Sequence, residues 1–267
     1  MRTILSCCAA KRSCSKIEIM NPFATDRMSE GYAAARPPVH RRVVDLIAQR
    51  GALTGVVLDV GSGSGLSTKA LDGIARKRIG VEPAEAMVRL ADGVSPGAAF
   101  AVGRAEALPL RAASVDWITA AGALNYVDLP ACFGEAARIL NPGGGVAVYD
   151  FSPGKVMRGS DSLTKWFQQF IARYPWAPAE ALALDPEILG QLGMGFGVES
   201  AERFAVGIEL TRAFYVSYMM TESNVAYALR RGVYEAEIRS WIESTLPEDG
   251  WGEIVFEGYW AIMQMWN

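Results

Sequence analysis

The sequence predicts an α/β fold in which a doubly wound, mostly parallel sheet of seven strands carries helices on both faces. Three observations predict it. Short apolar runs alternate with segments of helical periodicity between residues 39 and 151. The first run, VVLDV at 56–60, is rich in valine, as is typical of a strand buried on both faces of a parallel sheet. It ends in a glycine-rich turn that leads into a helical segment, so the first unit is strand, turn and helix.

The elements before residue 152 follow from periodicity and from proline and glycine positions. Pro37 and Pro38 allow a helix to begin near residue 39 but not earlier, and Val39, Val43, Leu46 and Ile47 recur at helical spacing. The remaining strands and helices alternate, which implies right-handed crossovers. We expect helices at 66–75, 84–92 and 130–140, and strands at 78–82, 98–102, 115–122 and 145–151.

The alternation stops after Phe151. Two helical segments, at 162–176 and 178–193, predict a helical cap inserted after the fifth strand, and GMGFGVES at 193–200 is interpreted as a flexible turn. The sheet is then expected to resume. The last elements predicted are strands at 202–210 and 253–266, with helices at 213–224 and 233–246 between them.

The chain of 267 residues is expected to form a single domain from residue 20 onward. Residues 1–19 are interpreted as a disordered extension, or as an incorrectly assigned start with translation beginning at Met20. The domain is divided into four parts. They are an N-terminal lid and helix at 20–50, a cofactor-binding core at 56–151, a helical insertion at 152–200, and C-terminal strands and helices at 201–267.

Composition favours a small-molecule partner. The formal net charge is −3, and the sequence shows neither a block of like charge nor an apolar run long enough to cross a bilayer. We therefore expect neither a nucleic-acid partner nor a membrane partner. Cys7, Cys8, Cys14 and Cys132 match neither a disulfide framework nor a metal site, so we predict no metal and a reducing, cytoplasmic compartment.

The turn after the first strand favours one class of cofactor. Gly61, Gly63 and Gly65 allow the backbone to approach a ligand closely. A dinucleotide-binding turn would carry its third glycine at the position of Leu66, so an NAD-linked oxidoreductase is disfavoured. Asp59, two residues before the first glycine, would repel a pyrophosphate but attract an ammonium or a sulfonium.

Glu82 ends the second strand, 21 residues after Gly61. Acidic residues at about this spacing accept hydrogen bonds from ribose hydroxyls. A solvated glutamate before Pro83 at a helix start is the alternative interpretation.

Four sequence blocks resemble the class I S-adenosylmethionine-dependent methyltransferases, of the broad type that includes ubiquinone/menaquinone-biosynthesis and trans-aconitate methyltransferases. The blocks are VVLDVGSGSG at 56–65, GVEPAEAMVRLA at 80–91, GRAEALPLRAASVDWITAAGALNYVD at 103–128 and LNPGGGVAVYDF at 140–151. The resemblance implies a Rossmann-like fold and S-adenosyl-L-methionine as the cofactor. It further implies contacts from Asp59, Gly61, Ser62 and Gly63 to the methionine part, from Glu82 and Pro83 around the ribose, from Met87, Ala105 and Glu106 around the adenine, and from Ala120 at the end of the fourth strand.

The resemblance also covers the N-terminal segment and the loop after the fourth strand. Tyr32 and Arg36 resemble a feature of relatives in which this segment folds over the cofactor, with a plain surface turn as the alternative. Arg104 replaces a common aspartate beside the adenine, and arginine cannot supply its acceptor. Asn125 stands where many relatives have histidine, and asparagine cannot act as a general base near neutral pH.

Methyl transfer is an in-line displacement that depends mainly on alignment of the reactants. The sole histidine, His40, is interpreted as an exposed helix residue. Asp128, Tyr149 and Asp150 are possible acceptor contacts, although such loop residues are commonly structural. The aromatic residues of the cap predict a mostly apolar acceptor pocket, and the substrate-binding candidates are Asn125, Tyr126, Trp166 and Tyr218.

Two functions remain open at this point. The first is methyl transfer to a small molecule, and the second is a catalytically silent relative that keeps the fold to bind a ligand or a partner. The residues specify neither the acceptor nor the oligomeric state.

Overall fold

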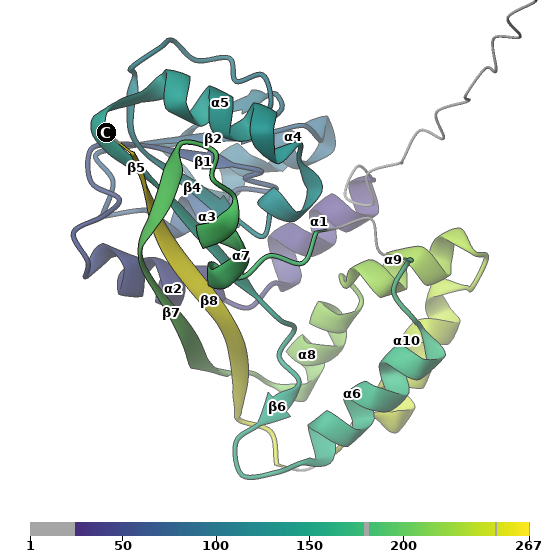
Figure 1. Ribbon diagram of the computed structural model, residues 1–267. Helices are drawn as coiled ribbons and strands as arrows, with labels where there is room; N and C mark the ends of the chain where they lie inside the picture. The colour runs from purple at the N-terminus through teal and green to yellow at the C-terminus, as the bar shows by residue number, and fades with distance from the viewer. Residues whose placement is uncertain (1–24, 179–181, 249, 267) are drawn as a thin grey trace, which may run out of the picture.

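The computed structural model describes residues 25–178, 182–248 and 250–266. The expectations for residues 1–19, for a start at Met20 and for Cys7, Cys8 and Cys14 concern residues outside these ranges. Within them, one mixed sheet with helices on both faces organises the chain, as predicted (Figure 1).

The sheet has eight strands, seven of them in the order β3-β2-β1-β4-β5-β8-β6. Strands β5 and β6 pair with different parts of one edge of β8, and β7 pairs with its other edge. The pairs from β3 to β5 are parallel, whereas β5, β6 and β7 each pair antiparallel with β8. The strands are β1 (Val56–Val60), β2 (Lys77–Glu82), β3 (Ala99–Val102), β4 (Val115–Ala121), β5 (Leu140–Phe151), β6 (Val156–Met157), β7 (Phe196–Glu209) and β8 (Glu253–Met265).

Helices cover both faces because side chains alternate along the central strands. Val57 faces the core formed with α2 and α3, whereas its neighbour Leu58 faces the core formed with α5 and α7. The helices on the core are α1 (Asp26–Ala35), α2 (Val39–Ala48), α3 (Leu66–Ala70), α4 (Glu85–Val94), α5 (Leu129–Ile139) and α7 (Pro186–Gln191), with a short 3₁₀ helix η1 (Leu124–Tyr126).

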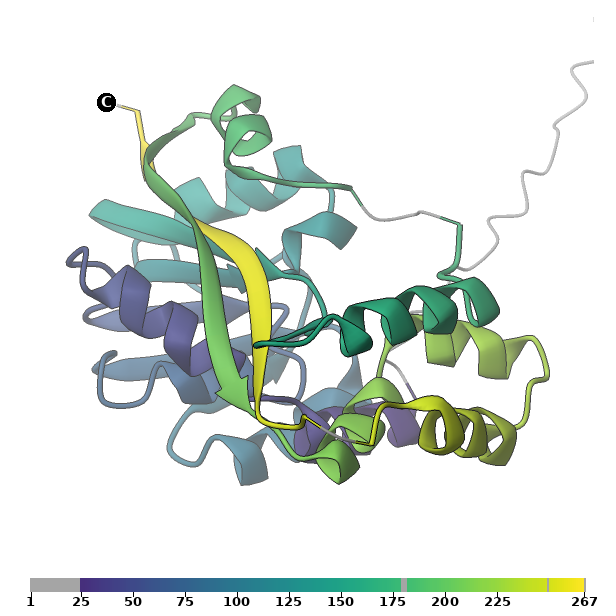
Figure 2. The ribbon, with the colours of Figure 1, turned by 90° about the horizontal axis from the view of Figure 1, so that it is seen from below.

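The helical cap lies at the end of the sheet where the parallel strands finish. It contains α6 (Ser162–Arg173), α8 (Arg212–Met219), α9 (Ser223–Arg230) and α10 (Glu235–Thr245), which form one group beyond this edge in both views (Figures 1 and 2). Only α6 comes from the insertion predicted at 152–200. The other three helices lie between β7 and β8, so two separate segments of the chain build the cap.

Local predictions fail where tertiary contacts decide the structure. Much of GMGFGVES is strand and not a turn, because β7 begins at Phe196 and pairs with the last residues of β8. The helix predicted at 213–224 breaks around Glu222, whose backbone is extended at the start of α9. Two further predicted helices, at 66–75 and at 178–193, shorten to α3 and α7 within the described residues, and Gly73 and Asp185 mark the new boundaries.

Candidate active site at the carboxyl ends of the strands

The glycine turn after β1 leaves open space at one residue. Gly61, Gly63 and Gly65 all have positive φ angles, of 67°, 53° and 89°. A Cβ atom on Gly61 would come within 2.5 Å of the Cβ of Ala123, so this position has no room for a side chain. Around Gly63, in contrast, no atom lies within 4 Å of the place of a Cβ. The backbone of Gly63 is therefore accessible to a ligand.

The carboxylate of Glu82 lies beside this open position. Its Oε2 accepts a hydrogen bond from the amide of Gly63 at 3.1 Å, and its Oε1 accepts one from the amide of Ala84 at 2.8 Å. The residue is only 7% exposed, and burial raises the pKa of the carboxyl group. A carboxylate offers about four acceptor positions, so two remain for a ligand.

Asp59 lies beneath the glycine turn and not on its open face. It is fully buried beneath the turn, and its carboxylate accepts hydrogen bonds from Ser67, Thr68 and Thr119 at 2.6, 2.6 and 3.0 Å. These donors fix the start of α3 and the end of β4 to β1. Burial raises the pKa of Asp59 and the three donors oppose this shift. Asp59 thus holds the turn in place, and its contact to the methionine part of the cofactor stays a prediction.

The side chain of Ser62 also points away from the open face. A Cβ on Gly80 of β2 would lie 2.8 Å from the Ser62 hydroxyl, which places that hydroxyl under the turn. The hydroxyls of Ser62 and Ser64 are buried and have no hydrogen-bond partner among the residues that the structure describes. Ser62 therefore presents no side chain to a ligand on the open face.

The other residues implied to surround the cofactor lie near the same edge. Met87 on α4, Ala105 after β3 and Ala120 near the end of β4 are buried, whereas Pro83 is exposed. Glu106 accepts a hydrogen bond from the amide of Asp128 at 3.1 Å and pairs with Arg104, so it connects the loop after β3 to the start of α5. Asp128 itself caps α5 through Ala131, which gives this exposed carboxylate a structural role.

Asn125 and Asp150 meet at the ends of β4 and β5. The amide Nδ2 of Asn125 donates to Oδ2 of Asp150 at 2.8 Å, and the backbone amide of Phe151 donates to Oδ1. A Cβ on Gly122 would lie 3.1 Å from Oδ1, so the carboxylate extends over the end of β4. Burial raises the pKa of Asp150. Tyr126, 58% exposed, borders this pair.

The N-terminal segment is a helix, α1, rather than a surface turn. It contacts α4 of the core and α8 of the cap. Arg36 at its end hydrogen-bonds to Tyr32, forms a 2.5 Å ion pair with Glu222, and lies over the rings of Tyr32 and Tyr218. Glu222 was not among the predicted site residues, because its partner Arg36 lies 186 residues away in the sequence.

His40 is half-buried, so its interpretation as an exposed helix residue is wrong. Its Nδ1 lies 3.0 Å from the hydroxyl of Tyr149, and its ring packs edge-on against Tyr149 and Phe151. Burial, together with the positive charge of Arg36, lowers the pKa of His40 to about 4. This environment could not be predicted from the residues around His40, because Tyr149 and Phe151 belong to the distant strand β5.

The low pKa of His40 predicts a loss of stability in mild acid. The unfolded histidine binds a proton near its ordinary pKa of about 6.5, whereas the folded one stays neutral down to about pH 4. The contribution of neutral His40 to the free energy of unfolding is therefore fully present above about pH 6.5. It is lost as the pH decreases from there to about 4. Between pH 7 and pH 5 the free energy of unfolding should decrease by about 2 kcal/mol. Urea denaturation at both pH values measures this decrease.

The control for this prediction is His40→Gln, because the chain has no other histidine. The variant should lose most of the decrease between pH 7 and pH 5. An equal decrease in the variant would assign the acid sensitivity to other groups.

The aromatic residues of the cap pack against one another. Trp166 is buried, stacks on Phe170 and Trp241, and donates to the hydroxyl of Thr245 at 2.9 Å. Trp166 thus packs inside the cap, and its place beside the acceptor stays a prediction. Tyr218 is also buried, but it borders Arg36 and Glu222. The aromatic acceptor pocket stays a prediction, and polar side chains around Asp150 also lie at this edge of the sheet.

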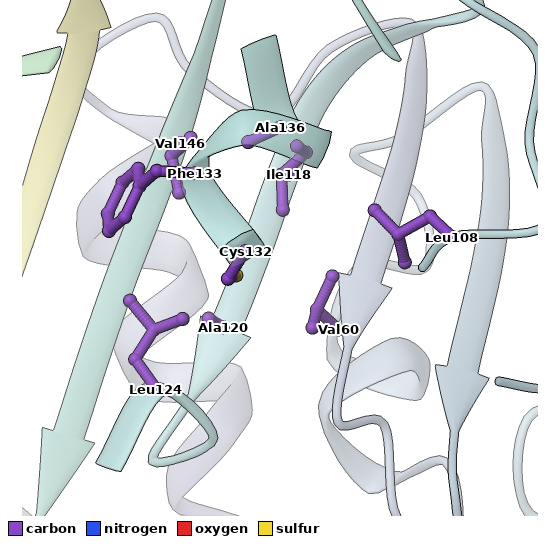
Figure 3. A pocket seen from close by; sticks show the side chains of 9 residues that line it. All are labelled: Val60, Leu108, Ile118, Ala120, Leu124, Cys132, Phe133, Ala136 and Val146. Atoms are coloured by element: carbon purple, nitrogen blue, oxygen red, sulfur yellow. The ribbon is translucent and has the colours of Figure 1, made fainter. Parts of the chain in front are cut away.

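A small cavity lies between the sheet and α5. Figure 3 shows its wholly apolar lining, which includes the buried thiol of Cys132. The lining residues are Val60, Leu108, Ile118, Ala120, Leu124, Cys132, Phe133, Ala136 and Val146. Because none of them carries a charge, the cavity does not suit a cationic ligand. Burial raises the pKa of Cys132 to about 12, so its thiol stays protonated.

Two further features were sought in the described ranges. They contain no helix with the length and apolar character of a membrane span. Nor do their histidine, cysteine and acidic side chains form a group of three or more suited to a metal ion.

Comparison with known proteins identifies the domain around the glycine turn. Residues 58–148 match the family model described as "Methyltransferase domain". This part of the chain is therefore similar to methyltransferase domains. This domain holds the glycine turn, Glu82 and Asn125, and ends two residues before Asp150.

Curated relatives share this methyltransferase domain. A ubiquinone/menaquinone biosynthesis C-methyltransferase of Acidiphilium cryptum is 35% identical over 138 residues, which cover 51% of this chain and 53% of that protein. An uncharacterized methyltransferase of Mycobacterium bovis is 32% identical over 113 residues, or 42% of this chain and 46% of that protein. The chain thus spans about half the length of these curated relatives.

Solved structures share the fold over more of the chain. A protein of Anaeromyxobacter dehalogenans assigned as a type II methyltransferase has a TM-score of 0.62 at 25% identity, with 79% of this chain and 89% of that chain covered. A protein of Anabaena variabilis assigned as a methyltransferase of an antibiotic biosynthesis pathway has a TM-score of 0.56 at 20% identity, with coverage of 86% and 98%. The second likeness shows the fold alone.

Proposed function

We propose that the protein transfers a methyl group from S-adenosyl-L-methionine to a small-molecule acceptor by in-line displacement. The observation that carries the proposal is the open backbone at Gly63 directly beside the buried carboxylate of Glu82. A ligand with a ribose diol next to a compact, positively charged group fits this pair.

The charges near the turn support a cationic cofactor over a dinucleotide. Asp59 lies beneath the turn and Glu82 lies beside it, close enough for the charge of Asp59 to raise the pKa of Glu82. Two buried carboxylates disfavour a pyrophosphate and favour a sulfonium. When bound, S-adenosyl-L-methionine would supply an electrophilic methyl group. The protein would bind the ribose through Glu82 and align the acceptor at the neighbouring strand ends.

The proposal also concerns partners and location. The formal net charge is −3, and the site lies at a polar edge of the sheet. We therefore propose a small-molecule acceptor and neither a nucleic-acid nor a membrane partner. The free, buried Cys132 is consistent with the proposed cytoplasmic location.

Calorimetric titration tests the cofactor assignment. S-adenosylmethionine and S-adenosylhomocysteine should both bind to the folded protein, whereas NAD should not. Failure of the first two to bind would reject the proposal. Binding without S-adenosylhomocysteine production across a broad acceptor panel would instead favour the catalytically silent alternative.

Glu82→Ala should weaken binding of S-adenosylmethionine by roughly 1 to 3 kcal/mol, because the ribose would lose its acceptor. The same titration measures the change. Glu85→Ala is the matched control, since Glu85 is exposed on α4 three residues away. Equal affinities of Glu82→Ala and the control would assign Glu82 a structural role only.

A further inference from the structure

Asp150 is half-buried at the ends of β4 and β5, on the side where we place the acceptor. Within the described part of the chain, its carboxylate accepts hydrogen bonds from the Asn125 amide and from the backbone of Phe151, which are both neutral donors. No lysine or arginine of the described residues forms an ion pair with it. A charge that is partly removed from water is also costly unless an opposite charge compensates it. A ligand that brings a positive charge would compensate Asp150.

The other charges near Asp150 do not supply this compensation. Arg36 is paired with Glu222 at 2.5 Å, so these two groups cancel. His40, packed against Phe151 and Tyr149, is neutral near pH 7 because its pKa is about 4. The combined charge of Asp150, Arg36, Glu222 and His40 is therefore close to that of the Asp150 carboxylate alone.

Asp150 lies on the acceptor side of the cofactor position. In the sheet order β1-β4-β5, its strand is two places from the glycine turn, or about 10 Å away. The carboxylate nevertheless extends back over the end of β4, since it lies 3.1 Å from the place of a Cβ on Gly122. The exposed ring of Tyr126 borders the same space, and an aromatic ring can stabilise a neighbouring cation.

We propose that the methyl acceptor is an amine, and that Asp150 binds its ammonium form beside Asn125 and Tyr126. The inference rests on the proposed function and names the substrate class of the same site. An amine differs from an alcohol, a phenol or a carbon acid in this respect, because none of these three brings a positive charge to pair with Asp150.

The chemistry balances without a further reactant. The ammonium releases one proton to the Asp150 carboxylate, which frees the nitrogen lone pair. That lone pair forms the new N–C bond as the methyl C–S bond breaks, and the bonding pair remains on sulfur. The products are a methylammonium and neutral S-adenosylhomocysteine. Asp150 then passes its proton to water and becomes a carboxylate again.

The test compares two probes of the same shape and different charge. The protein saturated with S-adenosylhomocysteine is titrated at pH 7 with benzylamine, which is then a cation, and separately with benzyl alcohol, which is neutral. Benzylamine should bind at least about tenfold more tightly, as hydrogen bonds to charged groups predict. Equal binding of the two probes, or no binding of benzylamine, would overturn the proposal.

Asp150→Asn should remove the preference for benzylamine and leave the binding of benzyl alcohol unchanged. Asp150→Glu should keep the preference, because it keeps the charge. Asp161→Asn is the matched control, since Asp161 is an exposed carboxylate at the start of α6. A preference that survives in Asp150→Asn would contradict the role of Asp150, and the wild-type comparison decides the proposal even where a variant fails to fold.

Binding of S-adenosylhomocysteine is measured first, in every variant. Its absence from the wild-type protein would reject the proposed function as a whole. Its presence together with equal binding of the two probes would reject only the amine acceptor.

Discussion

Gly63→Asn is expected to reduce the affinity for S-adenosylmethionine by roughly 100-fold or more, which corresponds to about 3 kcal/mol. Asparagine tolerates the positive φ of 53° at this position better than other residues with a side chain. Its side chain would occupy the open space beside Glu82, where we place the cofactor. Calorimetric titration measures the loss, and a thermal melt should show a folded protein.

Gly73→Asn provides the matched control for this experiment. Gly73 also has a positive φ, of 74°, and open space around the place of a Cβ, but it lies in the turn between α3 and β2. The control should bind S-adenosylmethionine like the wild type. If Gly63→Asn did so too, the cofactor would not occupy the space at Gly63.

Asp59→Ala should destabilise the protein by about 3 kcal/mol, because three buried hydroxyl donors would lose their acceptor. For a chain of this size, the melting temperature should decrease by roughly 6 to 12 °C. Differential scanning calorimetry measures both quantities. The cofactor affinity should also decrease, since Asp59 fixes the residues on both sides of the glycine turn.

Asp92→Ala is the control, because Asp92 is an exposed residue of α4. Its melting temperature should match that of the wild type. A similarly small effect of Asp59→Ala would show that the hydroxyls find other partners, and that Asp59 is available to a ligand as the resemblance implied.

The central part of the fold could be predicted because its signals are local. A continuous apolar run predicts a buried strand wherever it occurs, and glycines after it predict a turn, so β1 and the glycine turn follow from residues 56–65 alone. The position of Glu82 follows from its place at the end of the next strand. The hydrogen bond that its carboxylate accepts from Gly63 could not be predicted, because it joins two residues that only the folded sheet brings together.

The polar residues of the acceptor edge were harder to predict, because their partners are distant in the sequence. His40 pairs with Tyr149, and Arg36 pairs with Glu222, 186 residues later. Neither pair leaves a periodic or motif signal. The strand from Phe196 was missed for the same reason, since its pairing with β8 overrides the local preference of its glycines for a turn.

The way the cap joins the sheet has a consequence for how this protein could change its specificity. Strands β7 and β8 pair along their whole length, from Phe196 with Met265 to Glu209 with Glu253, and the amide of Leu210 bonds to the carbonyl of Gly252. The segment with helices α8 to α10 therefore takes the place of a hairpin loop between β7 and β8. Its two ends lie side by side at the end of this strand pair. Exchange of this segment with that of a relative would alter the acceptor side, including Glu222, without shifting the register of any strand.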